Sequence, residues 1–318
     1  MRLPAIRFKH WETLVHTFLS TIHACFSRYD IVHFHCIGPS IFSFLPRLFG
    51  KQTVVTVQGL DWRRAKWGWF ARHCLKLAEW ASTTFPNQTI VVSRVLQDYY
   101  QANYSKATSV VRNGTEIHEC EGTRHLRALG LLPNRYVLFL GRFSPEKNCH
   151  LLIQAFEKIQ TSFKLVLAGG SSHTDVYCAS LHAHASDRIV FLDWLSGESL
   201  QEVLANAALF VLPSDLEGLS LALLDAMGAG VCVLASDTPE NLEALGRTGF
   251  TFKRGEVADL LKMLTFLLEN EQFRTNAGAR ARERVRQNFL WDGIVDELAT
   301  IYARLVNRDE RHAAVVHR

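Results

Sequence analysis

Short, continuously apolar segments alternate with longer helix-like segments along this chain, and this alternation constrains the fold more than any other feature. Continuous runs of β-branched and apolar residues are typical of strands in a parallel sheet whose two faces are covered by helices. The sequence therefore predicts an α/β fold. The segments of this kind are Ile31–His35, Thr53–Val57, Thr89–Ser93, Ser109–Arg112, Tyr136–Leu140, Phe163–Ala168, Arg188–Leu192, Ala208–Leu212 and Val231–Ala235.

The predicted strands divide into two lobes. A polar, glycine-containing stretch from Asn113 to Pro133 separates the first four strands from the others. The length of 318 residues also corresponds to about two domains of ordinary size. We expect a first lobe over 1–115, a second lobe over 116–290, a helix over 291–306 that packs back toward the first lobe, and a charged tail over 307–318.

Composition excludes several classes of protein. A content of 48% hydrophobic and 21% charged residues is that of a globular chain, and a net charge of +4 is too small to indicate nucleic-acid binding. The seven cysteines are scattered without a C-x-x-C pair, so we expect no disulfide framework, no metal site and a reducing, cytoplasmic location. No apolar run approaches the roughly 18 residues of a membrane span, and the N-terminus does not resemble a secretory signal.

Polar and glycine-rich loops follow three of the predicted strands at their carboxyl ends, where parallel sheets bind ligands. Arg142 and Lys147 leave the end of one strand together, an arrangement that suits a diphosphate. A helix expected to begin near Gly218 adds free backbone N–H groups and the positive end of its dipole. These elements predict an anion site; the alternative is a pair of solvated surface charges. The pair Gly169-Gly170 follows another strand and is also a candidate for binding substrate.

Glu217 and Asp225 are eight positions apart, which corresponds to about 12 Å along a helix. Carboxylates bind diols well because they accept two hydrogen bonds at once. A nucleotide sugar has hydroxyl groups at both ends and a charged middle, so it fits this spacing. The alternative is that Glu217 is an acid favoured by the helix dipole and that Asp225 faces solvent.

These residues together resemble the retaining nucleotide-sugar glycosyltransferases of family 4, also called glycosyl transferases group 1. The family has the GT-B architecture of two Rossmann-like lobes. The resemblance covers about residues 30 to 305. It is carried by Gly141-Arg142 with Pro145-Glu146-Lys147-Asn148, by Leu165-Val166-Leu167-Ala168-Gly169-Gly170, by Leu212-Pro213-Ser214 with Glu217-Gly218, by Asp225-Ala226-Met227, and by Phe289, Trp291-Asp292 and Tyr302.

The resemblance implies transfer of a hexose-type sugar from a UDP-sugar or GDP-sugar to a glycan or lipid-linked acceptor, with retention of anomeric configuration. The second lobe would hold the donor and the first lobe the acceptor, without a cofactor or a catalytic metal. By the same resemblance, Arg142 and Lys147 would bind the diphosphate, Glu217 the transferred sugar, the amides of Gly218 and Leu219 the sugar or phosphate, and Asp225 the ribose.

The chain departs from the family pattern at three places. Asp225 stands where the family has Glu, and Gln58 stands where related sequences commonly have a histidine that contacts the donor sugar. Gln58 can donate and accept hydrogen bonds but cannot carry a proton. The first predicted strand begins only at Ile31, so by comparison we expect the first lobe to lack its opening strands and Gly-rich loop and to expose strand edges.

Two further features carry alternatives. His33 and His35 point the same way on a strand, which suits a metal pair but is more typical of buried strand histidines; His35, at the strand's end, would line the cleft. The basic, aromatic segment from Asp61 to Arg72 fits either a helix that packs its tryptophans into the lobe or a surface for a membrane or polyanion. The second alternative implies a lipid-linked or anionic glycan acceptor and peripheral association with the inner face of a membrane.

Other functions are disfavoured by missing motifs. No G-x-G-x-x-G follows any strand, as a dinucleotide dehydrogenase would require, and no P-loop motif occurs. The alternative that stays open is a catalytically impaired homologue or partner subunit that only binds the nucleotide sugar.

Overall fold

The computed structural model describes residues 12–64, 67–120, 122–171 and 174–316. The chain forms two compact units. The first unit consists of Met1–Arg112 with Asp292–Arg318, and the second unit of Asn113–Trp291. The chain start, residues 65 and 66 of the aromatic segment, and Ser172 and His173 after the predicted Gly-Gly loop lie outside the described residues.

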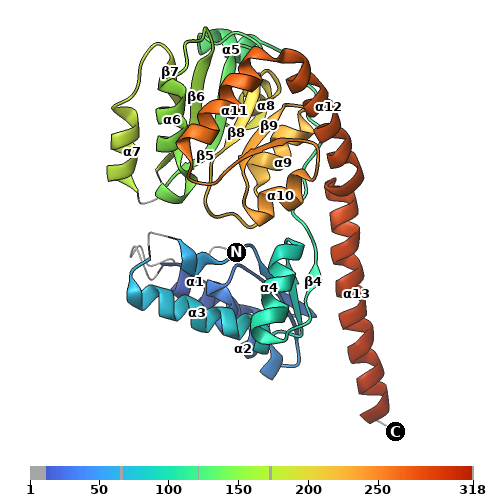
Figure 1. Cartoon of the computed structure of the whole chain (residues 1–318). Helices are drawn as coiled ribbons and strands as arrows, with labels where there is room; N and C mark the ends of the chain where they lie inside the picture. The colour runs from blue at the N-terminus through green and yellow to red at the C-terminus, as the bar shows by residue number, and fades with distance from the viewer. Residues whose placement is uncertain (1–11, 65–66, 121, 172–173, 317–318) are drawn as a thin grey trace. The chain divides into compact units, whose positions relative to one another are not determined.

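The first unit, of whose strands Figure 1 labels β4, is built on a parallel sheet with the strand order β1-β2-β3-β4. Each of these strands coincides closely with a predicted one, and β1 lies at an edge of the sheet. Phe34 of β1 is buried, whereas His35 at its end is exposed. The strands are β1 (Ile31–His35), β2 (Gln52–Val57), β3 (Gln88–Val91) and β4 (Ser109–Val110).

Helices pack on this sheet from distant parts of the chain. Ile294 and Leu305 of α13 contact Val54, Ile90 and Val111, so the end of the chain closes one face of the sheet. The helix α13 does not stop at 306 but continues to Val316 through most of the expected tail. The helices are α1 (Glu12–Phe26), η1 (Gly38–Phe42), α2 (Phe44–Leu48), η2 (Asp61–Arg63), α3 (Trp69–Thr84), α4 (Arg94–Tyr104) and α13 (Trp291–Val316).

The second unit is built on a parallel sheet with the strand order β10-β9-β8-β5-β6-β7. Five of these strands match predicted ones, and the short edge strand β10 was not predicted. The order places β5 between β8 and β6, so the ends of these three strands are neighbours. The strands are β5 (Tyr136–Phe143), β6 (Lys164–Ser171), β7 (Ile189–Leu192), β8 (Leu209–Leu212), β9 (Val233–Ser236) and β10 (Phe250–Phe252).

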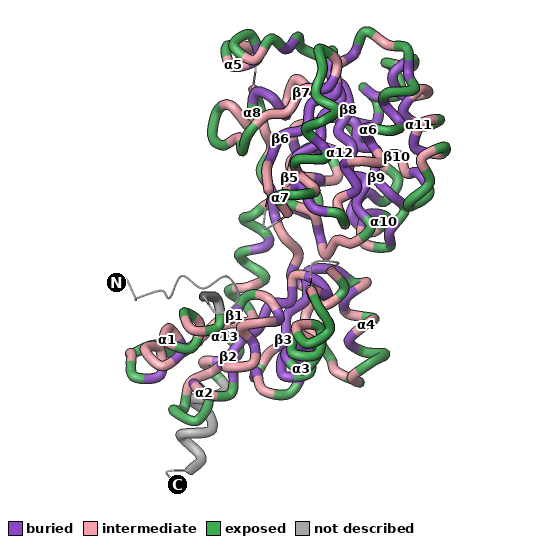
Figure 2. The backbone as a smooth tube through the Cα atoms, turned by 90° about the vertical axis from the view of Figure 1, so that its left-hand side faces the viewer, coloured by how far each residue is buried: buried purple, intermediate pink, exposed green. Residues whose placement is uncertain are grey.

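Helices cover the second sheet and bury its central strands, such as β8 and β9, which appear purple in Figure 2. Phe139 and Leu167 on the sheet pack with Phe156 of α6 and Leu264 of α11 in one cluster of fully buried side chains. Full burial of a side chain of this size contributes about 1.5–3 kcal/mol. The α/β prediction is confirmed. The helices are α5 (Arg124–Ala128), η3 (Pro145–Lys147), α6 (Cys149–Glu157), α7 (Asp175–His182), α8 (Gly197–Ala205), α9 (Leu221–Gly228), α10 (Pro239–Leu245), α11 (Val257–Glu269) and α12 (Glu271–Asn288).

Two strands run further than predicted. β5 continues past Leu140 to Phe143 and β6 past Ala168 to Ser171, so that Arg142 pairs with Gly170 inside the sheet instead of lying in a loop. The extension is possible because glycines face each other there: a Cβ on Gly169 would lie 1.9 Å from the carbonyl oxygen of Gly141. The position therefore requires glycine, which also tolerates its φ of +143°.

Candidate functional site

The predicted anion-binding residues of the second unit gather at the carboxyl ends of β5 and β8. Lys147 is in the short helix η3 after β5, and Glu217 is in the loop after β8. The Lys147 ammonium donates to Glu217 Oε1 at 2.5 Å, and the two side chains are only 14% and 9% exposed. A largely buried pair of this kind is screened little by solvent, so each charge holds the other in position.

Backbone contacts hold these two loops together. The backbone N–H of Asp215 donates to the Glu146 carbonyl at 2.9 Å. The Asn148 amide donates to the Pro213 carbonyl at 3.1 Å, and Asn148 takes the left-handed conformation, with a φ of +53°, that ends η3. The turn that carries Lys147 and the loop that carries Glu217 therefore form one rigid support.

Arg142 differs from Lys147 in its surroundings. It is half-buried near the end of β5, and within the described part of the chain its guanidinium has no hydrogen bond or ion pair. A guanidinium has five N–H donors in a planar fork that matches phosphate oxygens. Arg142 therefore keeps its donors available for an anionic ligand, whereas Lys147 is already paired.

The helix after the Glu217 loop begins later than predicted. α9 starts at Leu221 instead of near Gly218, because Ser220 is the N-cap and its hydroxyl accepts from the backbone N–H of Leu223. Gly218 and Leu219 lie in the loop just before the cap. Leu219 is buried, and its carbonyl accepts a hydrogen bond from the Asn113 amide at 3.1 Å. Their backbone amides are thus close to the helix start, where anions are favoured.

Asp225 is held by the segment that enters the second unit. The Thr115 hydroxyl donates to Asp225 Oδ1 at 2.5 Å, and His118 Nε2 lies 3.7 Å from the same oxygen. The Asp225 side chain is still 31% exposed. Asp225 is therefore neither freely solvated nor enclosed: one oxygen is held by Thr115, and part of the side chain stays accessible. Sequence reasoning missed Thr115 and His118, since nothing local links them to a helix 110 residues away.

Trp194 is a second residue that sequence reasoning missed. It follows β7, and its indole lies against Gly170: a Cβ built on Gly170 would be 2.8 Å from the indole nitrogen. The side chain is 59% exposed, which is unusual for so large an apolar group. The sequence signal that could have identified Trp194 is its position just after the predicted strand Arg188–Leu192. Figure 1 shows β5, β6 and β7 side by side.

Two predicted site residues, His35 and Gln58, belong to the first unit. His35 ends β1 and is exposed, with its ring stacked on His33 at a centroid distance of 4.2 Å. Gln58 follows β2 and is half-buried. Their assignment to the substrate stays a prediction, as do the ligand roles of the residues in the second unit.

His33 is held by hydrogen bonds within the fold of the first unit. Its ring nitrogens lie 2.6 Å from the Tyr302 hydroxyl and 2.7 Å from the Thr56 hydroxyl, so it bridges β2 and α13. Burial, together with the neighbouring His35, lowers the pKa of His33 from 6.5 to about 4. Among the described residues, no three His, Cys, Asp or Glu side chains lie together as a metal would require. None of the described helices is long and apolar enough to cross a membrane.

Models of two protein families match this chain. Residues 127–284 match the model described as glycosyl transferases group 1, and residues 3–119 match the model described as Glycosyltransferase Family 4. The two matches fall on different parts of the chain and together cover most of it. They agree with the family that the sequence motifs resemble.

Curated relatives are similar at moderate identity. The N-acetyl-alpha-D-glucosaminyl L-malate synthase of Bacillus anthracis is 30% identical over 187 residues, which are 57% of this chain and 48% of that protein. The sulfoquinovosyl transferase of Arabidopsis thaliana is 31% identical over 48% of this chain and 30% of that protein. The chain thus spans less than half the length of these two relatives. An uncharacterized glycosyltransferase of Methanocaldococcus jannaschii is 24% identical over 87% of this chain and 76% of its own length.

Solved structures share the fold over nearly the whole chain. The sucrose-phosphate synthase of Thermosynechococcus elongatus superposes with a TM-score of 0.82 at 22% identity, over 97% of this chain and 81% of that one. HepE of Anabaena, in complex with UDP-glucose, superposes with a TM-score of 0.81 at 20% identity, over 91% of this chain and 82% of its own. The predicted GT-B fold is confirmed.

Proposed function

This chain belongs to the glycosyltransferases of the group 1 and family 4 type, and from that premise we propose that it transfers a hexose-type sugar from a nucleotide-diphosphate sugar to a glycan or lipid-linked acceptor. The observation that carries the proposal is the grouping of Arg142, Lys147 and Glu217 at the ends of neighbouring strands. Two cations and a carboxylate on one support suit a ligand that combines a diphosphate with a hydroxylated sugar.

In the proposed reaction the bond between the sugar C1 and the diphosphate oxygen breaks, and a bond from C1 to the acceptor oxygen forms on the same face. The acceptor hydroxyl proton passes to the departing diphosphate oxygen, so configuration is retained and no side chain becomes a covalent intermediate. Negative charge grows on the leaving group during this step. Preorganised cations at Arg142 and Lys147 would stabilise the transition state more than the ground state, which lowers the barrier.

The other residues have supporting roles in the proposal. Glu217 would bind hydroxyl groups of the transferred sugar, while its bond to Lys147 keeps both side chains in place. Asp225, whose side chain is partly exposed, would bind the ribose, and the Gly218 and Leu219 amides would bind the sugar or a phosphate oxygen. His35 and Gln58 of the first unit would contact substrate from the acceptor side. No cofactor or metal takes part in this proposal.

The donor we favour is a UDP-sugar. This rests on similarity alone: among the solved neighbours, HepE of Anabaena is in complex with UDP-glucose, and the pneumococcal O-GlcNAc transferase GtfA is in complex with UDP and GlcNAc. We also infer a cytoplasmic location at the inner face of a membrane. All seven cysteines are free, as in a reducing compartment, and α3 of the first unit exposes the apolar side chains of Phe70, Leu77 and Trp80.

Binding and transfer are tested together. The purified full chain is heated with UDP, UDP-glucose, UDP-GlcNAc and GDP-mannose to find which raise its melting temperature. Release of the nucleotide is then followed with and without saccharide acceptors, and the product's anomeric configuration is read from its proton coupling constants. A raised melting temperature with transfer and retention supports the proposal.

The alternative function, a partner that binds the nucleotide sugar without transfer, predicts a different result. It would give the same rise in melting temperature but no nucleotide release with any acceptor, and Lys147→Met and Glu217→Gln would then change affinity alone. If no nucleotide raises the melting temperature, both functions are rejected.

A further inference from the structure

A basic, aromatic groove lies on the first unit, and none of the residues assigned above lines it. Six residues of η2 and the start of α3 line this groove, whose volume is about 460 Å³. We call it the α3 groove. The described residues that line it include no Asp or Glu; they are Trp62, Arg63, Trp69, Arg72, His73 and Lys76.

The floor of the α3 groove is fixed by a buried carboxylate. Glu79 is fully buried and accepts hydrogen bonds from the indole N–H of Trp62 and from the hydroxyls of Tyr99 and Tyr104, both at 2.8 Å. Burial, with Glu79 as acceptor, raises the pKa of Tyr99 to about 12, so it stays a donor. The three neutral donors occupy both oxygens of Glu79. This carboxylate therefore holds the Trp62 ring in place instead of pairing with a cation of the groove.

Two cations of the groove lie over the same aromatic ring, and none of the described residues that line the groove is acidic. The Lys76 ammonium lies 4.6 Å and the Arg63 guanidinium 5.2 Å from the centre of the Trp62 ring. The nearby Asp61 is paired instead with Arg64 at 2.8 Å, and Arg64 does not line the groove. Cation–ring contacts stabilise each cation but leave its charge uncompensated. An anionic group in the groove would offset this positive charge.

An aromatic wall completes the groove. Trp69 is 75% exposed, and its ring lies 4.4 Å from that of His73, whose Nδ1 is 2.8 Å from the Trp69 carbonyl oxygen. Aromatic walls with a few placed polar groups are the usual lining of small-molecule sites. A simple ion would use the cations of the groove but not this flat apolar face.

We propose that the α3 groove binds an acidic saccharide, a sugar unit that carries a carboxylate or a phosphate, with its charge on Arg72 and Lys76 and its ring on Trp69. That this saccharide is the acceptor rests on the proposed function; that the groove binds it does not. A membrane surface is the competing partner, because Phe70, Leu77 and Trp80 are also exposed on α3. These apolar residues do not line the groove, and a concave site with an aromatic wall suits a sugar better than a flat bilayer.

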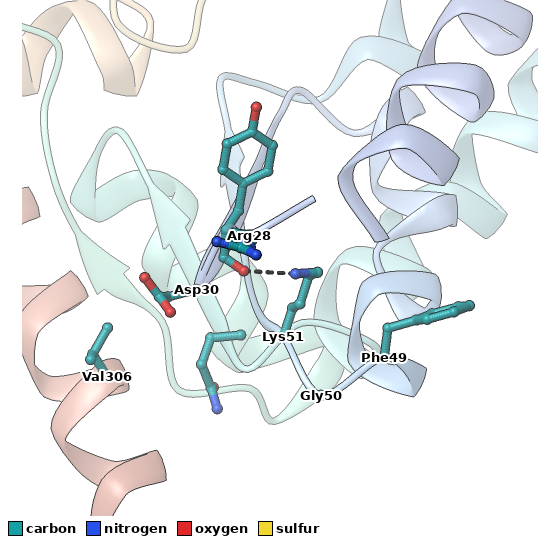
Figure 3. A pocket seen from close by; sticks show the side chains of 8 residues that line it. Arg28, Asp30, Phe49, Gly50, Lys51 and Val306 are labelled. Atoms are coloured by element: carbon teal, nitrogen blue, oxygen red, sulfur yellow. Dashed lines mark hydrogen bonds between the residues drawn. The ribbon is translucent and has the colours of Figure 1, made fainter. Parts of the chain in front are cut away.

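A second hollow in the same unit lacks these properties (Figure 3). It lies at the amino ends of β1 and β2 and has a volume of about 400 Å³. Its Lys51 ammonium donates to the backbone carbonyls of Ser27 and Tyr29, and its Arg28 and Asp30 carry opposite charges. This hollow has a carboxylate beside its arginine, and its lysine already donates to two backbone carbonyls, so it offers an anion less than the α3 groove does.

The test compares two trisaccharides with the same linkage type and different charge. Trigalacturonate and maltotriose are titrated into the full chain at low and at physiological salt, with tryptophan fluorescence and calorimetry as readouts. We expect trigalacturonate to bind at least tenfold more tightly than maltotriose and to weaken with salt. R72Q/K76Q should reduce its affinity at least tenfold, and Trp69→Ala should also reduce it. R28Q/K262Q removes two exposed charges elsewhere and should leave affinity unchanged.

The other outcomes are distinct. Equal binding of the two trisaccharides, no binding of either, or no effect of R72Q/K76Q overturns the proposal. If the protein binds phosphatidylglycerol vesicles through these residues but not trigalacturonate, the groove is a membrane contact and the proposal is wrong. UDP binding, measured in parallel by melting temperature, separates this result from failure of the proposed transferase function. Each variant's melting temperature shows that it is folded.

Discussion

The ammonium of Lys147 and the carboxylate of Glu217 lie 2.5 Å apart although 70 residues separate them in the chain. Their loops follow β5 and β8, which are neighbours in the sheet. Arg142, on the same strand end as Lys147, has no such partner in the described structure. Lys147 therefore contributes to the stability of the fold as well as to the proposed site, whereas Arg142 contributes to the proposed site alone.

Lys147→Met and Arg142→Gln should consequently reduce transfer alike but differ in their effect on stability. We expect both to reduce transfer by about 10²–10³-fold, because each removes a preorganised charge from the leaving group. Lys147→Met should also lower the free energy of unfolding by about 1–3 kcal/mol, since it leaves a largely buried carboxylate unpaired, whereas Arg142→Gln should change it by less than about 0.5 kcal/mol. Initial rates and urea unfolding measure the two effects, with the exposed Lys158→Met as control. Equal losses of stability would contradict the distinction.

Thr115 is expected to act as a positioning residue for the nucleotide. Thr115→Val removes the hydroxyl that donates to Asp225, so the carboxylate loses its orientation. Because a hydrogen bond to a charged group contributes about 1.5–3 kcal/mol, we expect the donor KM to rise roughly tenfold or more while kcat changes little. Thr115→Ser should restore the wild-type KM. A parallel fall in kcat, or no rescue by serine, would show that Thr115 serves the fold and not the ribose site.

Gly169→Ala should destabilise the second unit. The new Cβ would lie 1.9 Å from the Gly141 carbonyl oxygen, at a φ of +143° that side chains rarely adopt. We expect a loss of roughly 3 kcal/mol or more from the combined clash and backbone strain. Gly38→Ala, where a Cβ meets nothing within 4 Å, is the matched control. Thermal and urea unfolding measure both variants, and similar stabilities would refute the close approach of β5 and β6.

Acid should weaken the first unit through His33. Its pKa is about 4 in the folded chain and near 6.5 when unfolded, so the unfolded state binds the proton first. The neutral ring stabilises the fold fully above pH 6.5, and this contribution is lost as the pH falls toward 4. Between about pH 7 and pH 5 we expect a loss of about 1–2 kcal/mol. Melting temperatures of wild type and His33→Gln across this range measure it, and an equally steep fall in His33→Gln would assign the effect to other groups.

Local patterns were enough to predict the α/β architecture. Apolar runs such as Val54–Val57 and Leu209–Leu212 become buried parallel strands because a segment buried on both faces must be apolar throughout. The sequence also shows directly which residues follow a predicted strand, so Arg142, Lys147 and Glu217 could be named as candidates. The short strand β10 was not predicted, since a run of three residues is too short to show a strand pattern.

Tertiary structure alone decided which of these residues meet. Strand order places β8 beside β5, and no local pattern contains that order. It pairs Lys147 with Glu217, and the return of the chain onto α9 sets Thr115 against Asp225.

The sequence by itself thus determined the fold class and the residue types at the strand ends, because strand and helix periodicities are properties of neighbouring residues. The tertiary structure determined how those residues are paired, supported and exposed. It left Arg142 with its donors available, laid Trp194 against Gly170, and occupied both oxygens of Glu79 beneath the α3 groove. These relations depend on packing between segments far apart in the chain, which no local pattern specifies.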